Sequence, residues 1–273
     1  MRRERGFALV VVLWSMALLA LLGARVVATG RGELALAANL RTAAAAEALA
    51  DGALYEAIFH LLAGPPHRWA PDGAVRELRL PGGSARIRIE NEAGKIGLNS
   101  APPELLRALF LRLGIDEGRA TRLASAILDW RSPGQRARPF GAKDPEYRAA
   151  GRVYAPPLSG FWSLDELGLV LGMTPELLAL VTPHLSLYAG REPDMRFADQ
   201  VVAQAVLDVA GPDRAEYLAA TARVDQPDVV LITAAAVTED ARRARFTRRA
   251  HVRLGAGMHG RGWKVLSWEV PGD

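Results

Sequence analysis

The stretch RERGFALVVVLWSMALLALLG, residues 3–23, decides how the rest of this chain is interpreted. It begins with charged residues, and from Phe7 to Ala24 it then carries no charged side chain over 18 residues. A helix of that length rises about 27 Å, close to the thickness of a bilayer core. The apolar part of a cleaved secretion signal is shorter, about 7–15 residues. The stretch therefore predicts a membrane-crossing helix whose basic N-terminus stays on the cytoplasmic side.

The helical pattern continues beyond the apolar stretch. Residues 34–62 are rich in alanine and leucine, which are strong helix formers, and the next strong breaker is Gly64-Pro65-Pro66. A nearly continuous helix from Phe7 to Leu62 would be about 84 Å long. The plainer alternative is a membrane anchor followed by an ordinary helix. An anchor alone has no need of such an extension.

The junction Arg5-Gly6-Phe7 resembles the processing site of type IV pilin-like precursors. In those proteins a membrane peptidase cuts after the glycine and methylates the new N-terminal amine. The resemblance implies a leader of residues 1–6, with cleavage and N-methylation at Gly6 and Phe7. Most such proteins have glutamate at the fifth mature position, where it pairs with the amine of a neighbouring subunit. Here Val11 stands at that position, which predicts a subunit without a neighbour on that side.

Composition narrows the classes of function. The chain has 273 residues and no cysteine, so no disulfide and no thiol chemistry are available. Its 34 basic and 30 acidic residues nearly balance, so the net charge of +4 is weak evidence for a nucleic-acid partner. The five histidines form no His-Glu-x-x-His motif, and there is no Gly-x-Ser-x-Gly motif or phosphate-binding glycine loop. We therefore expect a protein that is not an enzyme.

The pattern beyond the long helix predicts β-structure on both sides of a helical segment. Residues 75–90 alternate apolar and charged side chains around Pro81-Gly82-Gly83, which is typical of a hairpin. The segments 229–237, 244–254 and 262–270 predict three further strands, preceded by a helix over 193–210. Between these parts lie two similar helical units, joined by an irregular stretch that is rich in Pro, Gly and Arg. In the first unit, Ser100 is a plausible helix N-cap.

Several motifs in order resemble the general secretion pathway protein K family, the large minor pseudopilins of type II secretion. They are NEAGKIGLNSAPPELL, AILDW, Tyr147, Tyr154, FWSLDEL and TPHLSLY. The resemblance implies an α+β, pilin-like fold with a long N-terminal hydrophobic helix, an antiparallel sheet and a large all-helical inserted domain. The expected parts are a leader at 1–6, the long helix at 7–63 with its membrane part at 7–24, a pilin-like domain at 64–92 and 190–273, and the insertion at 93–189.

The same resemblance implies the function and the partners. The protein would be anchored in the inner membrane by a single span, with its C-terminal bulk in the periplasm. It would form or cap the tip of the periplasmic pseudopilus with the I- and J-type minor pseudopilins and contact the major pseudopilin, supporting protein export across the outer membrane. A prepilin peptidase would process it, and no nucleic acid is expected. A minor pilin of a type IV pilus is the alternative, although ordinary minor pilins lack a helical insertion.

Some members of the family bind calcium near an Asp-Trp motif that is followed by further Asp residues. Here Asp129-Trp130 is followed by Arg-Ser-Pro-Gly, and calcium needs several oxygen ligands. Asp129, Asp144 and Glu146 are the remaining, weak candidates, and local capping or pairing of Asp129 is the alternative. No other cofactor is expected.

One helical feature leaves a nucleic-acid alternative open. Leu113-Gly114-Ile115 with its flanking helices is similar to half of a helix-hairpin-helix, which holds phosphates on backbone amides. Asp116 stands where that motif needs a second glycine, and its carboxylate would repel phosphate. The arginine-rich segment 242–253 is most simply the solvated face of a strand, and contact with an acidic partner surface is the functional alternative.

Overall fold

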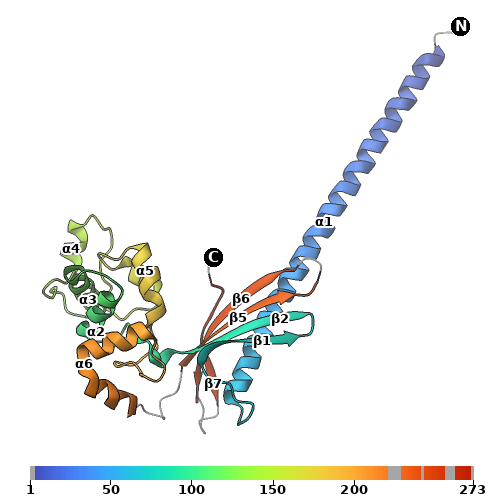
Figure 1. The fold of residues 1–273 in the computed structure, drawn as a ribbon. Helices are drawn as coiled ribbons and strands as arrows, with labels where there is room; N and C mark the ends of the chain where they lie inside the picture. Colours follow the sequence, from blue (N-terminus) through green and yellow to red (C-terminus); the bar gives the residue numbers. More distant parts are fainter. Residues whose placement is uncertain (1–3, 221–228, 241–242, 256–261, 272–273) are drawn as a thin grey trace.

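The computed structural model describes residues 4–220, 229–240, 243–255 and 262–271. A long helix, α1 (Glu4–Leu62), carries a sheet near its C-terminal end, and a helical lobe is attached at one end of that sheet (Figure 1). The remaining elements in chain order are β1 Asp72–Leu80, β2 Gly83–Asn91, η1 Glu92–Gly94, β3 Ile96–Gly97, α2 Pro103–Arg112, α3 Glu117–Arg131, α4 Asp144–Ala149, η2 Asp165–Leu169, α5 Pro175–Val181, η3 Thr182–His184, β4 Leu185–Ser186, α6 Gln200–Ala220, β5 Val229–Thr238, β6 Arg245–Leu254 and β7 Trp263–Glu269.

The main sheet is antiparallel and has the strand order β1-β2-β5-β6-β7. Strand β2 therefore pairs both with β1 and with β5, which follows the whole helical lobe in sequence. The expected hairpin, the expected C-terminal strands and the α+β class are confirmed. The insertion between β2 and β5 is tolerated because the two strands lie side by side, whatever the length of the chain that joins them.

One face of the sheet is buried against α1. Alternate residues of β2, such as Ile87 and Ile89, are fully buried, while the residues between them are exposed. On α1 half of the core residues are alanines, which let the helix lie close to the strands. This core contains Ala50, Ala53, Leu54, Ala57, Ile58 and Leu61 of the helix and Ala85, Ile87, Ile89, Val230, Ile232, Ala234, Ala236, Ala250 and Val252 of the strands.

The helical lobe, residues 96–210, has a separate core around Phe110, Leu109 and Tyr147. Its two helical units each turn at a glycine of positive φ, Gly114 (φ 82°) and Gly172 (φ 91°), a conformation that side chains other than glycine rarely adopt. The two-residue strands β3 and β4 pair in parallel at the base of the lobe. The expectation of an all-helical insertion is therefore wrong in this detail.

The helix expected over 193–210 begins later and belongs to the lobe. Asp199 accepts a hydrogen bond from Val202 N (3.0 Å) and so caps the start of α6, and Gly211 (φ 76°) breaks the helix. Its buried residues Val202, Ala205 and Val206 lie in the core of the lobe and not on the sheet. The residues that follow 189 therefore do not all belong with the sheet, because α6 packs against α2 (Figure 1).

Candidate functional site: the free helix, its junction with the sheet, and the lobe

The N-terminal part of α1 projects away from the body of the protein (Figure 1). Among the residues of α1 whose side chains are described, the first buried one is Thr42. Between Phe7 and Leu22 the described large apolar side chains are all exposed, from 48% at Val11 to 75% at Phe7. A continuous apolar surface of this size marks a region that a membrane or another protein covers.

No helix within the described residues is long and apolar enough to cross a membrane.

The expected processing residues lie on this free part of the helix. Gly6 and Phe7 are in the first turns of α1, and Val11 follows about one turn later. The hydroxyl of Ser15 donates to Val11 O (2.8 Å), so the one polar side chain in this region is satisfied within the helix. Met1, Arg2 and Arg3 of the expected leader lie outside the described residues.

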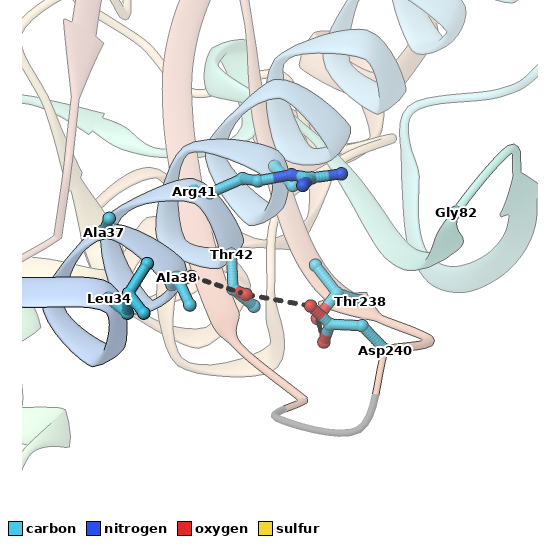
Figure 2. Close-up of a pocket in the computed structure, with 9 residues that line it drawn as sticks. Leu34, Ala37, Ala38, Arg41, Thr42, Gly82, Thr238 and Asp240 are labelled. Atoms are coloured by element: carbon cyan, nitrogen blue, oxygen red, sulfur yellow. Dashed lines mark hydrogen bonds between the residues drawn. The ribbon is translucent and has the colours of Figure 1, made fainter. Parts of the chain in front are cut away.

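A groove marks the point where α1 leaves the sheet, between the helix and the end of β5 (Figure 2). Thr42 Oγ1 lies 2.9 Å from Asp240 Oδ2, and Thr238 Oγ1 donates to the other oxygen of the same carboxylate (2.7 Å). The helical side of the groove is mostly apolar, with Leu34 and Ala38 (Figure 2). The carboxylate of Asp240 thus links α1 to the end of the central strand β5 at the last turn before the helix becomes free.

Arg248 forms a second link between α1 and the sheet. Its side chain is only 7% exposed, and its Nε donates to Asp51 Oδ1 (2.7 Å), while Nη2 contacts Glu47 Oε1 at 2.5 Å. The guanidinium also lies over the rings of Phe246 and Trp268, 4.8 and 5.4 Å from their centroids. The bond to Asp51 raises the pKa of Arg248 further above its ordinary value, against the effect of burial.

The arginine-rich segment 242–253 is therefore not only a solvated strand face, as the simplest interpretation of the sequence predicted. Arg248 within it is buried and holds α1 on the sheet. Arg242 lies outside the described residues.

The weak calcium candidates do not come together as a metal site. Asp129 is 1% exposed, and its carboxylate accepts from Arg138 N (3.0 Å) and pairs with Arg138 Nε (3.5 Å). Asp144 pairs with Arg148 on its own helix, and Glu146 accepts from Lys143 N (2.8 Å) as part of a capping box. In the part of the chain that the structure describes, no three acidic, histidine or cysteine side chains are grouped so that they could hold a metal ion. The residues present therefore do not fit calcium, which needs several oxygen ligands.

A buried lysine lies beside Asp129 instead. The Nζ of Lys143, which is 2% exposed, donates to Asp129 O and to Ser132 O, the second at 2.8 Å. Burial lowers the pKa of Lys143, and the Asp129 carboxylate opposes that effect. The ammonium satisfies carbonyl groups at the C-terminal end of α3, where a positive charge is favourable. No sequence signal distinguishes this lysine from a surface residue, because its burial depends on the loop over 132–143.

Two further residues at the base of the lobe, Arg131 and Ser100, have roles that the sequence did not predict. The Arg131 guanidinium donates to Leu98 O and Ala101 O, and burial lowers its pKa to about 10. Ser100 is not an N-cap: its hydroxyl donates to Gly190 O (2.8 Å), and α2 begins after Pro102. The physical reason is that the base of the lobe brings the carbonyls of residues 189–190 within reach of this hydroxyl.

In the hairpin that is similar to a helix-hairpin-helix, an acidic side chain caps the helix end that would face a phosphate. Asp116 is the N-cap of α3 and accepts from Arg119 N (2.9 Å), so a carboxylate already lies at that helix end. In the second unit, Thr174 caps α5 in the same way and accepts from Leu177 N (3.3 Å). Both turns are therefore explained by the folding of the lobe.

The comparisons with known proteins agree with this architecture. A family model described as protein K of the type II secretion system matches residues 88–190, from the end of β2 through most of the helical lobe. No curated protein matches the chain. A chain in the crystal structure of the GspK–GspI–GspJ complex from the type 2 secretion system of enterotoxigenic Escherichia coli is similar in fold, with 18% sequence identity and a TM-score of 0.63. The similarity covers 89% of this chain and 99% of that chain. The chain is thus similar to protein K of the type II secretion system over residues 88–190, and it shares its overall fold with a chain of the GspK–GspI–GspJ complex.

Proposed function

We propose that the chain is a minor pseudopilin of a type II secretion system, which forms or caps the tip of the periplasmic pseudopilus together with I- and J-type minor pseudopilins and so supports protein export across the outer membrane. The observation that carries the proposal is the free apolar part of α1, which projects from the body while the bulky lobe lies at the far end of the sheet (Figure 1). The similar structure is a complex with GspI and GspJ, which supports subunits of these kinds as partners.

The apolar part of α1 would have two successive environments. Before assembly, residues 7–24 would hold the chain in the inner membrane with the lobe and the sheet in the periplasm. During assembly the same side chains would pack against the helices of neighbouring subunits, including the major pseudopilin. Both environments remove the exposed apolar surface from water, which stabilises the buried state by roughly 25 cal/mol for each Å² of apolar surface. The role is mechanical, which is consistent with a family of structural pseudopilins.

A prepilin peptidase would prepare the chain by cutting after Gly6 and methylating the amine of Phe7. Val11 would then occupy the fifth mature position. Because valine cannot pair with the amine of a subunit on that side, the absence of glutamate suits a terminal subunit. The mass and sequence of the mature N-terminus, with and without the peptidase, test this step. An unprocessed Met1 in the presence of the peptidase would contradict it.

Assembly can be tested separately from processing. The full chain is co-expressed with the I- and J-type pseudopilins, extracted in a neutral detergent and purified through this subunit. We expect both partners to co-purify, and we expect Leu13→Arg to abolish this because a charge on the apolar face cannot be buried against a neighbouring helix. The control is Arg136→Glu on the exposed surface of the lobe. Co-purification that survives Leu13→Arg would contradict helix packing, and normal secretion in a deletion strain would contradict the function.

A further inference from the structure

The face of the sheet that points away from α1 is exposed and basic in the part that lies farther from the helical lobe. Since Ile87 and Ile89 face α1, the residues that alternate with them point to the other side. This side carries exposed arginines of three strands, which we call the basic sheet face: Arg79, Arg86, Arg88, Arg245 and Arg249. None of these five has an ion pair with a described residue, in contrast to Arg248 on the opposite face.

The register of the strands arranges these arginines around a row of small side chains. Arg88 pairs with Thr233 of β5, which pairs with Arg249 of β6. Arg88 and Arg249 therefore lie two strand spacings apart, which is about 10 Å between their backbones. Ala235, the next residue of β5 on this face, lies beside Arg86 in the same way. The central strand β5 thus presents short side chains on this face, and the long arginine side chains of β2 and β6 flank it on both sides.

We propose that the basic sheet face binds the acidic surface of a protein partner. Arginine forms paired, charge-assisted hydrogen bonds with carboxylates, and none of these five guanidiniums forms an ion pair within the described part of the chain. The face also carries Glu77 opposite Arg86 and Glu269 opposite Arg249. A protein surface contains both signs of charge and can pair with arginines and these rim glutamates together. The inference does not depend on the position of the subunit in the pseudopilus.

The structure favours a protein over the other polyanions. Sheets that bind nucleic acids commonly present aromatic rings on which bases stack. The rows of this face that carry the arginines contain threonine, alanine, valine and serine between the charges, and Glu77 and Glu269 would repel phosphates. A lipid surface is too far away. With residues 7–24 in a bilayer, the helix rises about 27 Å from Ala24 to Thr42, where the sheet begins, which is about three Debye lengths at physiological salt.

The test compares two double variants of the full chain in neutral detergent. Arg88→Glu/Arg249→Glu reverses the basic sheet face. Arg136→Glu/Arg152→Glu makes the same change in net charge at two exposed arginines of the lobe that have no ion pair with a described residue. Fluorescence anisotropy measures the binding of a labelled glutamate-rich peptide, a single-stranded oligonucleotide of equal charge, and vesicles that contain anionic lipid. Circular dichroism checks that each variant is folded, and Arg88→Gln/Arg249→Gln replaces the reversal if it is not.

We expect the peptide to bind the wild type and the lobe variant similarly and to bind the sheet variant at least about tenfold more weakly, since one charge-assisted hydrogen bond is worth that much. The difference should shrink at high salt. Equal binding by both double variants would overturn the proposal. Tighter binding of the oligonucleotide than of the peptide, or binding of the vesicles alone, would overturn it in favour of a nucleic-acid or lipid surface.

Discussion

Arg248 of β6 and Asp51 of α1 are 197 residues apart in sequence, and an ion pair of 2.7 Å joins them across the core of the sheet. The pair fixes the long helix at one position along the strands, because Asp51 and Glu47 lie one turn apart on the same face of α1. The direction in which the free part of α1 leaves the body therefore depends on this contact as well as on the apolar core.

Replacing Arg248 with alanine is expected to lower the free energy of unfolding by about 3 kcal/mol. The buried arginine side chain makes charge-assisted hydrogen bonds with the partly exposed carboxylates of Asp51 and Glu47, and its removal also loses the contacts with Phe246 and Trp268. The neighbouring Arg249→Ala, on the exposed face, should change stability by no more than about 0.5 kcal/mol. Chemical denaturation of both variants measures the difference. Equal effects would show that the pair does not hold the helix on the sheet.

Gly97→Ala is expected to damage the base of the lobe. A Cβ at this position would lie 2.4 Å from Gly190 O and 2.6 Å from Ala189 O, and both are backbone atoms that cannot rotate away. Overpacking of this kind costs about 1–3 kcal/mol. Gly134→Ala is the matched control, since a Cβ there meets nothing within 4 Å. Thermal unfolding of the two variants should show a lower midpoint only for Gly97→Ala.

Lys143→Ala is expected to destabilise the lobe by about 2–4 kcal/mol, because the carbonyl groups of Asp129 and Ser132 lose their charged donor and the Asp129 carboxylate keeps only Arg138 as a cationic neighbour. Chemical denaturation of the variant and the wild type measures this difference.

In the wild type, we expect neither calcium nor a chelator to shift the unfolding midpoint. A ligand that binds the native state would raise the midpoint as its concentration increases. A calcium-dependent rise, checked by calorimetric titration, would contradict our assignment of these residues.

Stability should fall as the pH drops from about 7.5 to about 5.5, and His251 should account for part of the loss. Burial lowers the pKa of His251 below 6.5, although Glu92 and Glu269 oppose this effect, while Lys95 and Arg249 add to it. A lowered pKa means that the unfolded chain takes up the proton first, so protonation below the ordinary histidine pKa favours unfolding. The unfolding midpoint of His251→Gln should depend less on pH over this range. An unchanged dependence would exclude a contribution from His251.

Local patterns in the sequence determined most of the secondary structure. The uninterrupted helix formers before Gly64-Pro65-Pro66 predicted α1, and the alternation over 75–90 predicted the β1–β2 hairpin. Short-range chemistry is sufficient for such elements, because helix and strand periodicities are written into consecutive residues. The motifs that resemble protein K likewise lie within one continuous segment, which the family model then matched at residues 88–190.

The tertiary structure decided which residues of the same type are buried and paired and which are exposed. Arg248 is buried against α1 while Arg249 is exposed, and no property of the residues themselves separates the two. Lys143 became a core residue, and Ser100 bonded to Gly190 instead of capping α2. Each outcome depends on atoms that are distant in sequence, so the strand register and the return of the chain to the base of the lobe must be known first. The sequence alone thus determined the elements and the family resemblance, whereas the packing of those elements assigned partners to the charges.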